Sequence, residues 1–109
     1  MSKWEMLPDE KVMITKNGDC WGTPMTRFKN QVPGQYQFTN QRILFYGNGI
    51  IEKLRLKFEI PYDQIQAVRP FNVVFFPTGI QVDLKDGGSY RLSVMKRKEC
   101  MDLIESYLG

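Results

Sequence analysis

The sequence contains no histidine, only two cysteines and a single alanine. Without imidazole, Ser-His-Asp and Cys-His catalytic arrangements and histidine-ligated zinc sites are excluded. Two isolated cysteines, Cys20 and Cys100, cannot make a four-cysteine site, and we expect both to be reduced and packed as small hydrophobic residues. The shortage of alanine disfavours an all-helical fold, while 13% aromatic residues favour a sheet.

Long hydrophobic runs are also missing. The run Val73–Phe76 has four residues, far too few to cross a bilayer, and the N-terminus shows no signal-peptide pattern. We therefore expect cytoplasmic residence, with peripheral membrane association as a further option. The 109 residues, 42% hydrophobic and 25% charged, predict one globular domain over residues 1–109. Residues 1–8 have no clear period, so packing and fraying both stay open.

Hydrophobic periodicity predicts about seven strands followed by one helix. Apolar side chains alternate with polar ones over residues 35–38, 54–60, 80–85 and 90–94, as in half-buried strands. The period then changes, and an apolar stripe at helical spacing closes the chain: Cys100, Leu103, Ile104, Tyr107 and Leu108. Such a stripe needs a sheet to cover.

Turn residues divide these strands. Asn17-Gly18 is a strong hairpin signal and predicts a turn between strands at residues 10–15 and 20–28. Pro33-Gly34 predicts a second turn, and Asp86-Gly87-Gly88 predicts a tight hairpin. Pro61 is expected to begin one short helical turn.

Three segments in this order carry a family resemblance. The first is the hairpin Gly34 to Tyr46, which contains the motif Phe38-Thr39-Asn40-Gln41-Arg42-Ile43-Leu44-Phe45. The second is Phe58 to Ile65 followed by Val68, and the third is Gly79 to Val94 with the terminal helix. Together they resemble the GRAM domain, of the pleckstrin-homology-like (PH-like) superfamily, in its short stand-alone bacterial type.

The resemblance implies a mainly β fold: a partly open β-barrel, or two packed near-orthogonal sheets, of about seven antiparallel strands capped by the C-terminal helix. It also implies a non-catalytic binding module without a cofactor. Relatives bind membrane lipids, phosphoinositides among them, or proteins. No ligand is settled for the short bacterial type.

Two basic features are candidate anion contacts. Lys16 with Arg27 and Lys29 loosely fits the basic pattern that lipid-binding relatives carry across the first hairpin. Ordinary solvated strand faces are the favoured reading, and the net charge of +3 is weak support for an anionic partner. Arg42 could bind an anion, but a structural pairing with Asp63 or Glu59 is favoured.

The segment from Phe71 to Pro77 is the candidate interface. Five large apolar residues crowd one connection between two strands: Phe71, Val73, Val74, Phe75 and Phe76. They could form core in a buried strand. The following Pro77-Thr78-Gly79 favours a loop, and an exposed loop of this composition would mark a protein partner, a homodimer contact or a membrane-inserting wedge.

The sequence therefore predicts a non-catalytic module for protein or membrane-surface contact. Nucleic-acid binding on an open barrel face is the alternative, disfavoured by the low net charge and the lack of an aromatic-basic motif. An enzyme is the third option. Its carboxylate pairs would be Asp83 with Asp86 or Glu59 with Asp63, and each looks like ordinary surface.

Overall fold

The fold is a single antiparallel sheet of seven strands followed by one helix. The structure is a computed structural model that describes residues 4–24, 31–47 and 56–108. The strands are β1 (Val12–Gly22), β2 (Val32–Thr39), β3 (Arg42–Gly47), β4 (Lys57–Pro61), β5 (Ile65–Val73), β6 (Phe76–Leu84) and β7 (Ser89–Val94), and the helix is α1 (Arg97–Tyr107). The predicted strand number and terminal helix are confirmed.

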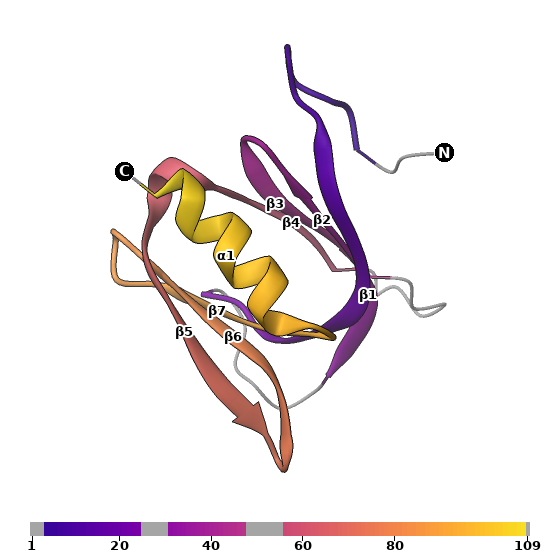
Figure 1. Ribbon diagram of the computed structural model, residues 1–109, viewed down its shortest axis with the longest axis vertical. Coiled ribbons are helices and arrows are strands. Elements are labelled where there is room, and N and C mark those ends of the chain that lie inside the picture. The colour runs from indigo at the N-terminus through magenta and orange to yellow at the C-terminus, as the bar shows by residue number, and fades with distance from the viewer. Residues whose placement is uncertain (1–3, 25–30, 48–55, 109) are drawn as a thin grey trace.

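The sheet curls into a half-barrel around α1 (Figure 1). The strand order is β4-β3-β2-β1-β7-β6-β5, so β4 and β5 are the two edges. A 3₁₀ turn, η2 (Tyr62–Gln64), carries the chain from one edge to the other after Pro61. The expected partly open barrel is confirmed, and it is built from one sheet. The exposed Pro70 lies in β5, where the missing N–H of a proline can face away from the ladder.

The core lies between the concave face of the sheet and α1. The alternation read from the sequence supplies it, since every second residue of a strand points inward. Cys100 and Ile104 of α1 pack against it. The largest fully buried side chains are Tyr36, Phe38, Phe45, Ile43, Leu44, Ile60, Ile80, Leu92 and Ile104. This helix is the cap that the apolar stripe predicted.

The turn predicted at Asn17-Gly18 is wrong, because both residues lie inside the long strand β1. Gly18 pairs with Gly34, which pairs with Gly47, so three glycines form a row across β1, β2 and β3. A Cβ on Gly18 would lie 2.2 Å from the carbonyl oxygen of Ser93. Gly18 and Gly34 thus allow neighbouring strands to approach closely. The turn predicted at Pro33-Gly34 is wrong for the same reason.

Candidate functional site

The most exposed hydrophobic side chains of the described chain lie at the end of the β5–β6 hairpin. Val73 pairs with Phe76, which leaves Val74 and Phe75 as a two-residue turn. We call Val73–Phe76 the hairpin tip. Val74 is 75% exposed, Phe75 89% and Phe76 65%. The exposure of the turn fits the loop alternative and not the core alternative. The place predicted for the loop is wrong, because Pro77-Thr78-Gly79, which favoured it, lies in β6, and Phe71 and Val73 are half-buried in β5.

The turn is also in an unfavourable backbone conformation. Val74 has φ 59°, a region that favours glycine and asparagine and is an outlier for a β-branched residue. Such a residue typically costs on the order of 1–3 kcal/mol, and such strain gathers at functional sites. The tip therefore combines backbone strain with exposed apolar surface, two features that oppose folding and solubility.

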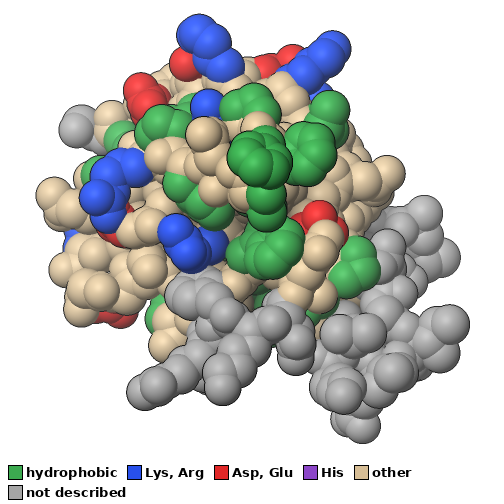
Figure 2. Space-filling view, turned by 90° about the horizontal axis from the view of Figure 1, so that it is seen from below, with side chains coloured by type: hydrophobic (Ala, Val, Ile, Leu, Met, Phe, Trp, Pro, Cys, Tyr) green, Lys and Arg blue, Asp and Glu red, His purple; other side chains and the backbone are tan. Residues whose placement is uncertain are grey.

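The hairpin tip stands beside a shallow apolar hollow. The hollow has a volume of about 380 Å³ and is lined in part by Trp21, Val74, Phe76 and Met95. Met95 is 69% exposed and follows directly after β7. Figure 2 views this end of the molecule and shows hydrophobic side chains gathered there with basic side chains beside them. The apolar surface thus extends from the tip across the end of β7.

Two arginines lie at the stem of the same hairpin. The guanidinium of Arg91 lies 4.4 Å from the ring centroid of Phe71, in cation–π contact. Arg97, at the start of α1, donates to the carbonyl oxygen of Phe71 at 2.9 Å. Lys96 is exposed and lies between Met95 and Arg97. Positive charge therefore surrounds the stem just behind the apolar tip.

The predicted anion contact is described in part. Arg27 and Lys29 lie outside the described residues. Lys16 lies in β1, and its ammonium is 3.4 Å from the carboxylate of Glu99 on α1. Its side chain is 19% exposed. This cation is therefore paired within the fold, and the three-residue contact stays a prediction.

Arg42 takes the structural role that was favoured for it. It donates to Glu59 at 2.9 Å, as one of the two predicted pairings requires, while Asp63 is not its partner. Its main partner is Glu10, through hydrogen bonds of 2.9 Å from both Nε and Nη2. Sequence reasoning missed Glu10, because nothing in the local pattern links two residues 32 positions apart.

The hydrogen bonds around this ion pair set both pKa values. Burial raises the pKa of Glu10, but hydrogen bonds from Arg42, Leu7 and Thr39 outweigh burial, and the pKa lies below its ordinary value. The hydrogen bond to Glu10 raises the pKa of Arg42. The pair therefore remains charged at neutral pH, and Arg42 is committed to the fold.

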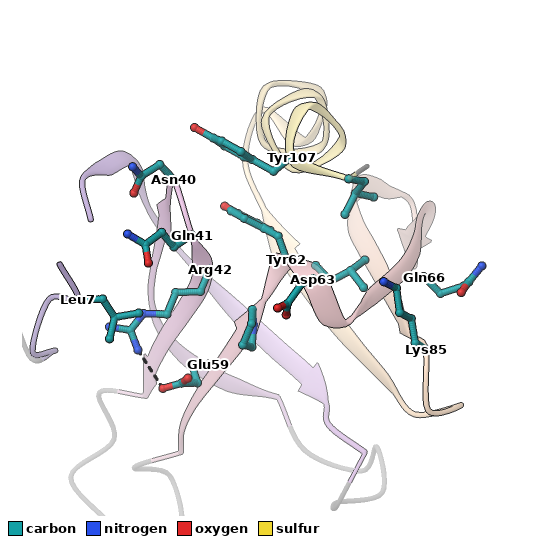
Figure 3. Close-up of a pocket in the computed structure, with 13 residues that line it drawn as sticks. Leu7, Asn40, Gln41, Arg42, Glu59, Tyr62, Asp63, Gln66, Lys85 and Tyr107 are labelled. Atoms are coloured by element: carbon teal, nitrogen blue, oxygen red, sulfur yellow. Dashed lines mark hydrogen bonds and ion pairs between the residues drawn. The ribbon is translucent and has the colours of Figure 1, made fainter. Parts of the chain in front are cut away.

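A groove lies between the β2–β3 corner and the C-terminal end of α1 (Figure 3). Its volume is about 820 Å³. Two tyrosines stack at its side: the rings of Tyr62 and Tyr107 are 5.0 Å apart and 7° from parallel. Tyr62 donates its hydroxyl to the carbonyl oxygen of Thr39 at 2.7 Å. The groove walls are mixed in charge, with Arg42, Glu59, Asp63 and Lys85 among them.

Three of the four carboxylates weighed for catalysis, Glu59, Asp83 and Asp86, accept hydrogen bonds within the fold. Glu59 accepts from Arg42, and Asp86 accepts from the backbone N–H of Gly88. Hydrogen bonds from Gln81, and then from Arg69, lower the pKa of Asp83. A general acid needs a raised pKa, so Asp83 is unsuited to that role. Across residues 4–24, 31–47 and 56–108, no group of three or more Cys, Asp or Glu side chains could hold a metal ion.

A family comparison decides the identity of this fold. Residues 6–106 match the family described as the bacterial PH domain. The chain belongs to the bacterial PH domain family. The PH-like superfold implied by the sequence is thereby confirmed, while the finer resemblance to GRAM stays a prediction. A comparison with curated proteins finds no match for this PH domain.

Solved structures share the fold at low sequence identity. A C-terminal domain of an unknown protein from Leishmania infantum superposes with a TM-score of 0.73 at 16% identity, covering 93% of this chain and 86% of the other. The Vps36 N-terminal PH domain gives 0.72 at 14%, covering 95% and 86%. The N-terminal PH domain of human ARAP2 gives 0.62 at 15%, covering 98% and 85%. These identities show a shared fold alone.

The described part of the chain can be searched for a helix that spans a membrane. No helix there is both long enough and apolar enough to cross a bilayer. The sequence flagged the apolar run of the hairpin tip, but not the neighbours that complete this surface. Arg91 lies in β7, Met95 directly follows β7 and Arg97 begins α1, and only the strand order brings them to the β5–β6 hairpin.

Proposed function

We propose that this PH domain is a non-catalytic binding module whose contact surface is the hairpin tip, Val73–Phe76. PH-like domains are typically such modules for lipids or proteins. One observation carries the proposal: the two-residue turn consists of a strained valine and an exposed phenylalanine, and a second exposed phenylalanine follows it at the start of β6. A turn selected only to connect two strands would carry glycine, asparagine or aspartate.

The exposed area supports a binding role. Val74, Phe75 and Phe76 together expose on the order of 400 Å² of mostly apolar surface, since a large aromatic side chain presents about 150–250 Å². Removing that area from water is worth several kcal/mol at about 25 cal/mol per Å². Exposed ion pairs such as Lys98–Asp102 contribute about 0–1 kcal/mol each. Hydrophobic contact therefore dominates the energetics of this surface.

The finer predictions belong to the same proposal. We propose that the Thr39–Arg42 corner is of the GRAM type. The module would reside in the cytoplasm, and its contact surface would bind a protein partner, a second copy of the chain or a membrane surface. Nucleic-acid binding has less support, because Lys16, Arg69 and Lys98 each form an ion pair with an acidic side chain. An enzymatic role has less support, because three of the four weighed carboxylates, Glu59, Asp83 and Asp86, accept structural hydrogen bonds.

Two matched substitutions test the tip. Phe75→Asp and Met13→Asp each replace an exposed apolar side chain, and Met13 is 52% exposed on β1. Self-association is measured by sedimentation and surface binding by co-sedimentation with vesicles, with the fold checked by circular dichroism. We expect Phe75→Asp to abolish an association that Met13→Asp retains. An association that survives Phe75→Asp in the folded protein would place the contact surface elsewhere.

A further inference from the structure

We propose that the hairpin tip inserts into the headgroup layer of an anionic lipid bilayer, with Arg91, Lys96 and Arg97 held near the lipid phosphates. This inference rests on the proposed function, because it names the partner of the same surface. Three properties of the described residues carry it: the shape of the tip, the depth at which the basic residues lie, and the sign of the charge.

Shape favours a bilayer over a protein partner. The tip is a narrow protrusion that ends in a two-residue turn, and its three exposed side chains offer roughly 400 Å². A stable protein interface buries about 800 Å² on each partner and needs a matching rigid surface. Lipid headgroups rearrange around a protrusion, so a bilayer can cover the whole tip without a preformed socket.

Depth fits the dimensions of a bilayer. Phe71 marks the stem, and Val74, the first residue after β5, lies three residues farther along the chain, about 10 Å beyond Phe71 at roughly 3.3 Å per residue. The headgroup region of one leaflet is about 5–8 Å thick. When Phe75 passes below the headgroups, Arg91 and Arg97, which contact Phe71, lie at the level of the phosphates.

Charge selects an anionic surface and disfavours a second copy. Arg91, Lys96 and Arg97 contribute three positive charges behind the tip, and Asp19 is the one acidic residue among those that line the neighbouring hollow. A two-fold contact through this end would bring two such basic sets together. On an anionic membrane each cation near the surface strengthens binding by about fivefold.

The experiment is co-sedimentation with two kinds of vesicle: phosphatidylcholine alone, and phosphatidylcholine mixed with phosphatidylglycerol. We expect binding to the mixed vesicles, weaker binding to the neutral ones, and a decrease as salt is raised. Phe75→Asp should weaken binding to mixed vesicles by tenfold or more, and Met13→Asp should not. A soluble inositol phosphate should not compete, because the tip binds a surface and not a free phosphate.

A second matched pair tests the charge. Lys96→Asn removes one charge at a position with φ 54°, which asparagine tolerates, and should weaken binding to mixed vesicles by about fivefold. Lys11→Asn removes the same charge from the exposed segment before β1, at the end of the molecule away from the tip in Figure 1. The molecule is 34 Å long, several times the distance over which salt screens a charge, so binding should not change.

The possible outcomes distinguish a lipid partner from a second copy of the protein. Absence of vesicle binding by the native protein, or binding unaffected by Phe75→Asp, overturns the lipid inference. If the native protein is instead a dimer that Phe75→Asp separates, the partner is a second copy, and the tip remains the contact surface. If neither vesicle binding nor self-association depends on Phe75, the proposed function fails as well.

Discussion

Glu10 and Arg42 form a buried ion pair through two parallel hydrogen bonds of 2.9 Å, joining residues 32 positions apart. The side chain of Glu10 is fully buried, and that of Arg42 is 6% exposed. Glu10 also accepts from the hydroxyl of Thr39 at 2.7 Å and from the backbone N–H of Leu7 at 2.9 Å. The carboxylate therefore fastens the segment before β1 to the β2–β3 corner.

The first prediction concerns this pair. Glu10→Gln keeps the shape of the side chain but leaves the buried guanidinium with less compensation, and should lower the free energy of unfolding by about 3 kcal/mol. Glu59, whose side chain is 48% exposed, is the matched control. Glu59→Gln should cost about 1 kcal/mol or less. Urea unfolding measures both, and equal losses would contradict the buried geometry.

The second prediction is a pH dependence. The folded-state pKa of Glu10 is lowered from its ordinary value of 4.5, so the folded protein binds a proton there less readily than the unfolded chain. The stability from this group is present above about pH 4.5 and is lost as pH falls through the folded-state pKa. Urea midpoints should therefore fall more steeply below pH 4.5 for the native protein than for Glu10→Gln. Parallel pH profiles would refute this.

The third prediction tests the glycine row. Gly18→Ala would place a Cβ 2.2 Å from the Ser93 carbonyl oxygen, a backbone atom that cannot turn away. The neighbouring strands must shift, and the loss should be about 3 kcal/mol, at the upper end for overpacking. Gly87→Asn is the control, since Gly87 has φ 97° and nothing within 4 Å of a Cβ. It should cost clearly less, as thermal unfolding can show.

The fourth prediction separates stability from binding at the hairpin tip. Val74→Gly removes a β-branched residue from φ 59° and should raise the free energy of unfolding by about 1 kcal/mol. The same change removes apolar surface and should weaken vesicle binding. Val73→Gly, one residue earlier inside β5, should destabilise instead. A destabilised Val74→Gly variant would show that Val74 is not strained.

The fifth prediction concerns the two thiols, which the structure shows to be free and buried. Burial raises the pKa of both Cys20 and Cys100 to about 11, so almost no thiolate exists at neutral pH. A disulfide-exchange reagent should modify both thiols quickly in urea and only at the rate of unfolding without it. Rapid reaction of the native protein would contradict this burial.

Much of the fold could be predicted because it depends on local periodicity. Alternation over residues 80–85 and 90–94 identified β6 and β7, and the helical stripe identified α1. The prediction failed at Gly18, where a glycine serves close packing between strands that are distant in sequence. A turn glycine and a packing glycine have the same local pattern, and only the strand pairing distinguishes them.

The candidate site was predictable only in part. The apolar run Val73–Phe76 was visible, but whether it was core or surface depended on where its turn fell. That turn occupies Val74 and Phe75, residues with no turn preference, whereas the turn-forming residues Pro77-Thr78-Gly79 lie in β6. Arg91 and Arg97 reach the stem through tertiary contacts, which no local pattern reports.

Pro70 has a consequence for how copies of this protein meet. The outer side of an edge strand, next to an exposed apolar turn, is a template to which strands of further chains can add, and such addition can lead to fibrils. Pro70 lies exposed in that strand, four residues before the turn, and offers no N–H to an incoming chain. The molecule can thus present an exposed apolar protrusion while the adjacent edge strand lacks one of the donors that an added strand would need.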